Sequence, residues 1–272
     1  MELSNGVLIP QFGLGTYLLE DKECYDSVKY ALQIGYRHFD TAEIYGNEIE
    51  VGNAIHDFLL ENPKIKRKDI FITSKIWNEN NKYELAKKAF SEILERLQTD
   101  YLDLCLVHWP TNDSFETWKL LEEMYEAKKV LAIGVSNFNI EHLQYFVKNA
   151  KVKPMMNQVE IHPGFGQKDL VDYCHEHKIA VISWKTLIGG NCENIPLLQK
   201  LAKKHNTSTS LISLRWAWQK NLVVIPKSKN KDRIMGNSEI NKFVLSESEI
   251  NEIDNLPQSR YGWVPDASVK WE

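Results

Sequence analysis

The fold is decided by three consecutive stretches: DIFITSK at 69–75, YELAKKAFSEILERL at 83–97 and YLDLCLVH at 101–108. The first and third are short runs of β-branched and aliphatic residues, which is typical of buried strands. The middle stretch repeats apolar residues at helical spacing. A strand, a helix and a second strand in this order predict two parallel strands covered by the helix that connects them.

The same alternation extends in both directions along the chain. Further strands are predicted at 36–40, 130–135, 155–160, 179–184 and 222–226, and further helices at 22–34, 48–60, 114–127, 141–150, 168–177, 196–205, 211–220 and 247–256. Seven strands are visible, and an eighth near Lys242–Leu245 would close a barrel. We therefore expect an α/β protein with a (β/α)8 barrel rather than an open doubly wound sheet.

An N-terminal β-hairpin is expected before the first helix. Leu3–Ser4 and Val7–Leu8 flank Asn5–Gly6, the pair that a type I′ turn prefers. The chain has 272 residues and contains no linker-like or low-complexity stretch, so we expect one domain over 1–272.

Charge and composition argue against several kinds of partner. Lys and Arg number 33 and Asp and Glu number 37, giving a net charge of −4. This balance gives no electrostatic reason to expect nucleic acid or an anionic membrane. No apolar stretch is long enough to span a bilayer, and the N-terminus does not resemble a secretory signal. The four cysteines form no CxxC pair, which is typical of reduced thiols in a cytoplasmic protein.

Polar side chains stand at the carboxyl ends of successive predicted strands, where parallel α/β proteins carry their chemistry. They are Asp40, Lys75, His108, Ser136 with Asn137, and Gln158 with Glu160 and His162. Any one of them could be an ordinary loop residue. An acid, a cation, a titratable ring and amides on five strand ends in a row predict a functional site.

Tyr45 lies five residues after Asp40 and is a candidate general acid. A neighbouring ammonium group such as Lys75 favours the ionised phenol, so we expect the pKa of Tyr45 to fall from about 10 towards neutrality. His108 could bind a substrate oxygen from the other side. Trp77 and Trp109 follow strand ends and could form the wall of an apolar pocket.

Seven blocks in order resemble the aldo-keto reductases, particularly the small microbial members. They are GLGTY (13–17), DTAEIYGNEIEVG (40–52), FITSKIW (71–77), LDLCLVHWP (102–110), GVSNF (134–138), NQVEIHP (157–163) and IPKS (225–228). The resemblance implies a (β/α)8 barrel that reduces aldehydes and ketones with NADPH, bound without a Rossmann domain. In agreement, Gly13-x-Gly15 lacks the third glycine of a dinucleotide fingerprint.

The resemblance also assigns roles to residues. It implies a catalytic tetrad of Asp40, Tyr45, Lys75 and His108, in which Tyr45 protonates the carbonyl oxygen, Lys75 lowers its pKa, Asp40 holds Lys75 and His108 orients the carbonyl. The implied substrate contacts are Tyr17, Tyr45, Trp77, His108 and Trp109. The implied cofactor contacts are Gly15, Thr16, Asp40, Ser136, Asn137, Gln158, Trp184, Leu187, Lys227, Ser228, Lys229, Asn230, Arg233 and Asn237, with Lys227 and Arg233 on the 2′-phosphate of NADPH.

The chain departs from the family pattern at several positions. Lys185–Thr186 replace a common Ser-Pro, which changes the expected pyrophosphate contacts of this loop, although the charge of Lys185 could compensate. Gly236 replaces a glutamate that commonly precedes the asparagine in contact with adenine, which predicts the loss of that contact and weaker cofactor binding. Tyr17 stands where tryptophan is common. The connection after His108 and the C-terminal tail are short, which predicts an open site with broad specificity for small aldehydes, dicarbonyls or keto-sugars.

Two other functions remain open on the sequence. Glu160-x-His162 and His175-x-His177 could suggest a metal enzyme, but the second pair lies on different faces of a helix end, so we expect no metal. A redox sensor or regulatory subunit that binds a nicotinamide cofactor with little turnover is the alternative to a reductase. We expect a monomer with a small carbonyl compound as its partner.

Overall fold

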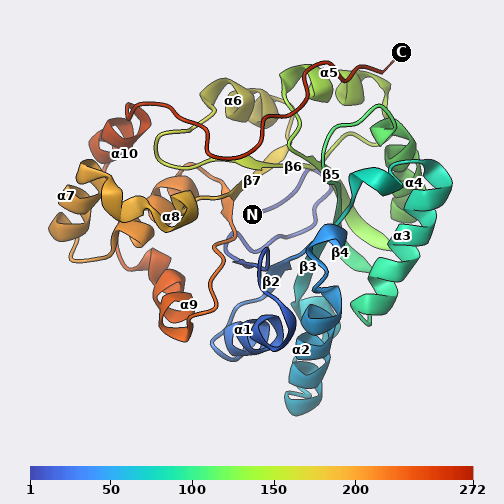
Figure 1. The fold of residues 1–272 in the computed structure, drawn as a ribbon, viewed down its shortest axis with the longest axis horizontal. Coiled ribbons are helices and arrows are strands. Elements are labelled where there is room, and N and C mark those ends of the chain that lie inside the picture. The colour runs from blue at the N-terminus through green and yellow to red at the C-terminus, as the bar shows by residue number, and fades with distance from the viewer. Residues whose placement is uncertain (272) are drawn as a thin grey trace.

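The computed structural model describes residues 1–271, so Glu272 of the expected domain lies outside the described residues. Eight parallel strands form one sheet in the order of the sequence, with helices around its outside (Figure 1). The strands are β1 (Leu14–Gly15), β2 (His38–Asp40), β3 (Phe71–Ile76), β4 (Leu102–Val107), β5 (Val130–Ser136), β6 (Met156–Glu160), β7 (Ala180–Trp184) and β8 (Val223–Val224). The predicted (β/α)8 barrel is thereby confirmed.

The helices lie where the hydrophobic spacing predicted them, except α9 (Lys231–Asn237), which the sequence did not predict. They are α1 (Asp21–Gln33), α2 (Glu48–Glu61), α3 (Tyr83–Arg96), α4 (Ser114–Glu126), α5 (Ile140–Asn149), α6 (Lys168–Glu176), α7 (Pro196–Lys204), α8 (Thr209–Gln219), α9 (Lys231–Asn237) and α10 (Glu247–Asp254). No helix among residues 1–271 combines the length and the apolar character needed to cross a membrane.

The barrel closes between β8 and β1, and the expected eighth strand near Lys242–Leu245 is wrong. Phe12 pairs in parallel with Val224, and the Gly13 amide donates to the Val224 carbonyl over 2.9 Å. Residues 242–245 form a coil instead. Gly15 serves this closure, because a Cβ on it would lie 2.7 Å from the Ile225 carbonyl oxygen, whereas a Cβ on Gly13 would meet His38 of β2. The close approach of two chain segments leaves room only for glycine there.

The N-terminal hairpin is present, but its turn is not of type I′. Glu2 and Leu8 pair in antiparallel fashion, and the Gly6 amide donates to the Leu3 carbonyl. Only Gly6 of the turn has a positive φ, of 86°. A type I′ turn needs a positive φ at Asn5 as well. The Asn5 side chain instead donates to the Leu131 carbonyl over 2.9 Å, tying the hairpin to β5.

The barrel strands are buried on both faces, as parallel strands between helices must be. Every residue of β3 and β4 is buried, and the apolar ones belong to a single hydrophobic core. All four cysteines are free and buried within it. A cluster of polar groups that includes Asp40, Lys75 and His108 stands at the carboxyl ends of the strands. The C-terminal segment, residues 257–271, runs from α10 past β6 and β7 towards α5 on that side of the barrel (Figure 1).

Candidate active site

The ends of β2 and β3 place a carboxylate and an ammonium in direct contact. The Lys75 Nζ lies 2.7 Å from Asp40 Oδ1 and also donates to the Thr41 carbonyl over 2.8 Å. Both side chains are buried. A buried ion pair is a stable arrangement only when further hydrogen bonds satisfy its atoms. Here Gln158 Nε2 satisfies the second oxygen of Asp40 over 2.7 Å.

Tyr45 is placed beside this pair by a short turn. Its hydroxyl lies 3.4 Å from Lys75 Nζ, at the end of a short 3-10 helix over Glu43–Tyr45. The turn ends at Gly46, whose φ of 67° suits glycine. Asn47 then holds the loop, because its Nδ2 donates to the carbonyls of Thr16 and Leu19. Asn47 was not predicted from the sequence, although the pair Gly-Asn after Tyr45 is a turn signal that could have indicated it.

The expected fall in the pKa of Tyr45 is wrong. Burial raises the pKa of the phenol above its usual value, and the neighbouring Lys75 ammonium only partly opposes this effect. Asp40 adds to the rise, because its negative charge offsets that of the ammonium. Burial alone would lower the pKa of Lys75, but Asp40 and Tyr45 outweigh it and the net direction is upward. At neutral pH the site therefore holds a neutral phenol beside an ammonium group.

His108 faces the phenol from the end of β4. Its ring centroid lies 5.8 Å from that of Tyr45 and 5.1 Å from that of Trp77. Burial and the positive charge of Lys75 hold the pKa of His108 well below its usual value. The ring is therefore neutral at physiological pH. A neutral imidazole carries one N–H donor, which can bind a substrate oxygen without adding charge.

Amide side chains gather at the ends of β5, β6 and β7. Asn137 Nδ2 donates to the His108 carbonyl and to Ser136 Oγ, both over 3.0 Å. Its Oδ1 accepts a hydrogen bond from Trp184 Nε1 over 2.9 Å, and Ser136 Oγ donates to the Gln158 carbonyl. Asn137 has a positive φ of 63°, a conformation that asparagine tolerates better than most residues. The structure thus brings together Ser136, Asn137, Gln158 and Trp184 beside His108.

The predicted phosphate contacts lie after β8. Lys227, Lys229 and Arg233 are exposed, whereas Ser228 is largely buried. Asn230 is the N-cap of α9, because its side chain accepts from the Arg233 amide over 3.0 Å. Lys229 pairs with Glu23 of α1 over 3.1 Å.

Of the remaining expected cofactor residues, Thr16 lies at the edge of the barrel that carries Asp40 and Lys75. Thr16 and Asn237 are buried, and Leu187 is half-buried. Thr16 Oγ1 donates to the Asp40 carbonyl, which connects the β1 side of this edge to the ion pair.

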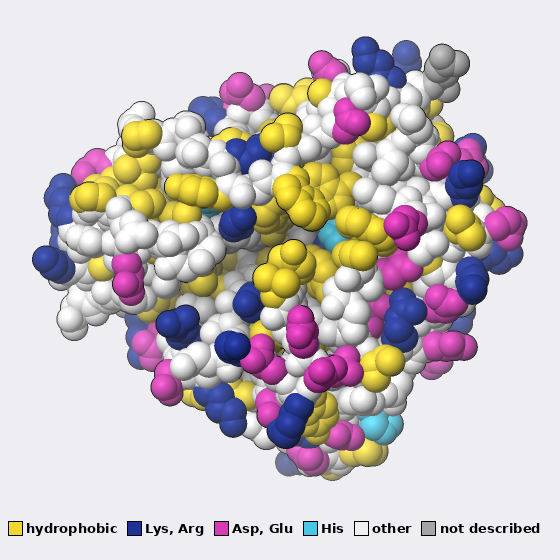
Figure 2. Space-filling view, in the orientation of Figure 1, with side chains coloured by type: hydrophobic (Ala, Val, Ile, Leu, Met, Phe, Trp, Pro, Cys, Tyr) yellow, Lys and Arg dark blue, Asp and Glu magenta, His cyan; other side chains and the backbone are white. Residues whose placement is uncertain are grey.

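Aromatic side chains surround the mouth of the site. Tyr17 lies 5.0 Å from Tyr45 between ring centroids, and Trp109 lies 6.1 Å from Trp263. Figure 2 shows hydrophobic side chains around a hollow in this face, with a histidine visible beside it. Trp263 was not predicted from the sequence, because the C-terminal segment brings it to the rim from 154 positions after Trp109. No local pattern indicates such a contact.

Glu43 is a second missed residue. Its carboxylate accepts from the Trp77 amide over 2.9 Å and from Asn80 Nδ2 over 2.5 Å. The turn that carries Tyr45 is thereby tied to the loop that carries Trp77.

Glu160 and His162 are in contact, with 3.3 Å between Nε2 and Oε1. No group of three potential ligands for a metal is found among residues 1–271.

Known proteins resemble this chain in sequence and in fold. A sequence model of the Aldo/keto reductase family matches residues 11–257. Glyoxal reductase of Bacillus subtilis (strain 168) is 45% identical over 269 residues, covering 98% of this chain and 96% of that protein. The 9,11-endoperoxide prostaglandin H2 reductase of Trypanosoma cruzi (strain CL Brener) is 43% identical, covering 97% and 94%. Among solved structures, MGS-M4, an aldo-keto reductase from a Medee basin deep-sea metagenome library, superposes with a TM-score of 0.94 at 39% identity over 98% of both chains.

Proposed function

This chain belongs to the aldo/keto reductase family, and on that premise we propose that it reduces small aldehydes and dicarbonyl compounds with NADPH, using Tyr45 as the proton donor. The observation that carries the proposal is the contact of three groups at the strand ends. Lys75 Nζ lies 2.7 Å from Asp40 and 3.4 Å from the Tyr45 hydroxyl. An acid, a cation and a neutral phenol in this order suit proton donation to an oxygen that gains negative charge.

The residues present fit a nicotinamide dinucleotide. Ser136, Asn137 and Gln158 offer the paired donors and acceptors that a carboxamide requires. Gln158 donates its amide to Asp40, while its Oε1 takes part in no hydrogen bond found among residues 1–271 and remains able to accept one. The exposed side chains of Lys227 and Arg233 suit a phosphate, to which Arg binds as a planar fork. Trp184 offers a flat aromatic surface beside Asn137.

The roles of the side chains follow from their charges. NADPH, when bound, supplies the hydride that reduces the carbonyl carbon. The neutral ring of His108 donates a hydrogen bond that orients the carbonyl oxygen. Tyr45 gives its proton to that oxygen, and the aldehyde leaves as an alcohol. The Lys75 ammonium stabilises the phenolate that remains on Tyr45 until water returns the proton, and Asp40 fixes the position of Lys75.

The aromatic rim supports a substrate that is small or flat. Tyr17, Trp77, Trp109 and Trp263 present ring surfaces around the mouth, so binding there relies on apolar contact more than on specific polar groups. Small aldehydes, dicarbonyls and open-chain keto-sugars each present a reactive carbonyl group and need few other specific contacts in such a pocket. The name of the Bacillus subtilis relative, glyoxal reductase, is consistent with this class.

A carbonyl reduction assay tests the proposal. Purified protein is mixed with NADPH and glyoxal, methylglyoxal or an aromatic aldehyde, and the loss of cofactor absorbance is followed. We expect turnover with all three compounds and unchanged rates in the presence of a chelator. Tight NADPH binding without turnover would contradict the reductase function and favour a redox sensor. Loss of activity with the chelator would favour a metal enzyme.

The preference for NADPH is tested by removing both exposed cations after β8. We expect the double variant Lys227→Ala/Arg233→Ala to raise the KM for NADPH about tenfold or more, because each charge-assisted contact to a phosphate contributes about 1.5–3 kcal/mol when fully formed. The KM for NADH should change much less. Lys203→Ala/Lys204→Ala, in the last turn of α7, is a matched control for lost charge. An equal rise for both cofactors would contradict recognition of the 2′-phosphate.

A further inference from the structure

The C-terminal segment, residues 257–271, is fastened to the barrel at a few separate points. The Ser259 amide donates to the Gly164 carbonyl, and Trp271 Nε1 donates to the Thr111 carbonyl over 3.0 Å at the far end. Between these points the segment forms neither helix nor strand. Trp263 and Val264 are 72% and 75% exposed. The course of this segment over the site therefore depends on individual contacts.

Glu160, at the end of β6, makes the most concentrated of these contacts. Its carboxylate accepts from the Tyr261 amide over 2.9 Å and from the Gly262 amide over 2.8 and 2.9 Å. His162 Nε2 lies 3.3 Å from the same group, and Arg260 lies 3.6 Å from it. The carboxylate is buried and both of its oxygens are used. Burial alone would raise its pKa, but these donors outweigh burial and lower the pKa below its usual value.

Gly262 allows the segment to lie directly on Trp184. A Cβ at this position would stand 2.3 Å from Trp184 Cη2 and 2.7 Å from Glu160 Oε2. Real atoms do not approach so closely, so any side chain here would lift the segment away from the indole. Lys185 adds a second restraint, because its Nζ donates to the Tyr261 carbonyl over 3.1 Å. The main chain at 261–262 is thus held on the outer side of Trp184.

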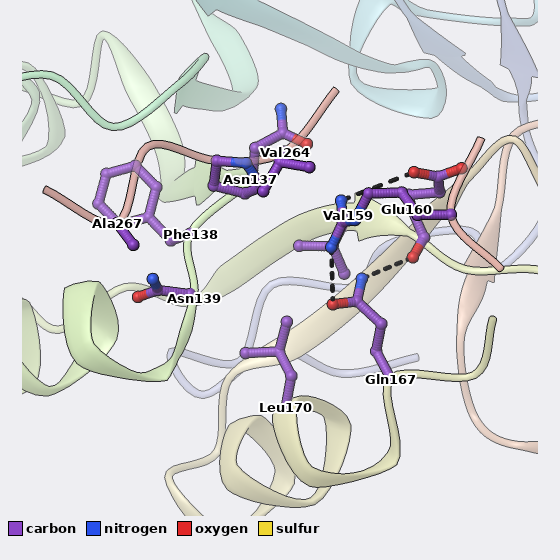
Figure 3. Close-up of a pocket in the computed structure, with 11 residues that line it drawn as sticks. Asn137, Phe138, Asn139, Val159, Glu160, Gln167, Leu170, Val264 and Ala267 are labelled. Carbon is purple, nitrogen blue, oxygen red and sulfur yellow. Dashed lines mark hydrogen bonds and ion pairs between the residues drawn. The ribbon is translucent and has the colours of Figure 1, made fainter. Parts of the chain in front are cut away.

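A cavity lies beside the hydrogen bonds that Glu160 accepts from Tyr261 and Gly262, between the barrel and the following part of the segment. It has a volume of about 180 Å³ and is lined by Asn137 and Glu160 on the barrel and by Val264 and Ala267 on the segment. Figure 3 shows these residues around it, with Gln167 bonded to the main chain of Glu160. Residues 264–267 are therefore not packed tightly on the barrel. Because the cavity leaves these residues without neighbouring atoms on one side, they lose van der Waals contacts with the barrel.

We propose that Glu160 is a positioning residue, whose carboxylate holds the main chain of Tyr261 and Gly262 against Trp184 and thereby places Trp263 opposite Trp109 at the mouth of the site. Glu160 is not in contact with the reacting atoms. It acts through Trp184, which touches Asn137, and through Trp263, which borders the space a bulky carbonyl compound would enter. The effect on substrate binding rests on the proposed function, whereas the anchoring itself does not.

Hydrogen exchange measures the anchoring directly. In Glu160→Ala we expect amide exchange in the peptide covering residues 257–265 to accelerate about tenfold or more, because hydrogen bonds to a charged acceptor are among the stronger ones. Glu160→Gln keeps one carbonyl acceptor and should accelerate exchange less. The matched control is Asp103→Asn, since Asp103 is a buried carboxylate that accepts from the Ile72 amide and from Arg67 at the opposite end of the barrel. This control should leave the segment unchanged.

Steady-state kinetics tests the positioning. In Glu160→Gln the KM for a bulky aromatic aldehyde should rise severalfold, with kcat and the KM for glyoxal changed little. Gly262→Ala should have the same effect on the KM for the bulky aldehyde, although it keeps the Glu160 carboxylate. This variant keeps the positioning role testable if a Glu160 variant fails to fold. Unchanged exchange would overturn the anchor whether or not the protein is a reductase. Faster exchange with an unchanged KM for the bulky aldehyde would overturn the positioning role. Absence of turnover in the unaltered protein would contradict the proposed function and leave the exchange result standing.

Discussion

Replacing Tyr45 by Phe is expected to lower kcat for carbonyl reduction by about a hundredfold to ten-thousandfold, the range that a positioned proton donor contributes. The substitution removes one hydroxyl and keeps the ring that packs against Tyr17 and His108. The affinity for NADPH, measured by fluorescence titration, should change little, because the cofactor contacts proposed here lie elsewhere. Undiminished turnover would contradict the role of Tyr45 as proton donor.

The pH profile of the unaltered protein supplies a second measurement on the same group. The raised pKa of Tyr45 keeps the phenol protonated, and the lowered pKa of His108 keeps its ring neutral. We therefore expect kcat/KM for reduction to stay level through neutral pH and to fall only as the pH passes the usual tyrosine value of about 10. A fall that begins near neutrality would mean that the Lys75 ammonium outweighs burial. Tyr17→Phe is a matched control, since it removes a neighbouring phenol, whereas the hydrogen bonds of Lys75 Nζ found among residues 1–271 go to Asp40, Thr41 and Tyr45.

Lys75→Met is expected to affect both stability and activity. It leaves the buried Asp40 without its cation, and breaking a buried pair in this way costs about 3–5 kcal/mol of unfolding free energy. It also removes the charge that stabilises the Tyr45 phenolate. We expect the denaturant midpoint to fall clearly and kcat to fall to the level of the Tyr45→Phe variant, measured on protein that is still folded by circular dichroism.

Arg67→Met separates these two effects. Arg67 pairs with the buried Asp103 over 2.8 Å at the other end of the barrel, so its loss also leaves a buried carboxylate without its cation. This variant should lose stability and keep kcat. If Lys75→Met retained kcat while losing only stability, the lysine would be a structural residue and the proposed mechanism would be wrong.

Local sequence patterns predicted the alternating strands and helices of the barrel. Each strand from β3 to β7 has enough β-branched and aliphatic residues to be recognised, and polar residues at or just after the carboxyl ends of β2 to β6 mark the edge of the site. β1 escaped notice because it contains only Leu14 and Gly15. Its two residues carry no periodicity, and the closure that it makes depends on Val224, some 210 positions away.

The errors in the site have a common physical cause. The pKa of Tyr45 depends on how far the phenol is buried and on Asp40 cancelling the charge of Lys75, neither of which spacing along the chain reveals. The contacts of Glu160 with Tyr261 and Gly262 join residues about 100 positions apart through main-chain amides. Because any residue type except proline supplies an amide, such a contact leaves no mark in the sequence of the donor side.

The brevity of β1 and β8 has a consequence for the molecule as a whole. These two-residue strands form the seam at which the first and last parts of the chain meet, and only a few main-chain hydrogen bonds hold it. On the proposed assignment, a dinucleotide would touch Thr16 on one border of the seam and Ser228 on the other. Its binding energy would then be added to the stability of the closed ring, since a ligand that binds only the folded chain favours that state. In such an arrangement the bound coenzyme would stabilise the closed barrel in addition to supplying the hydride.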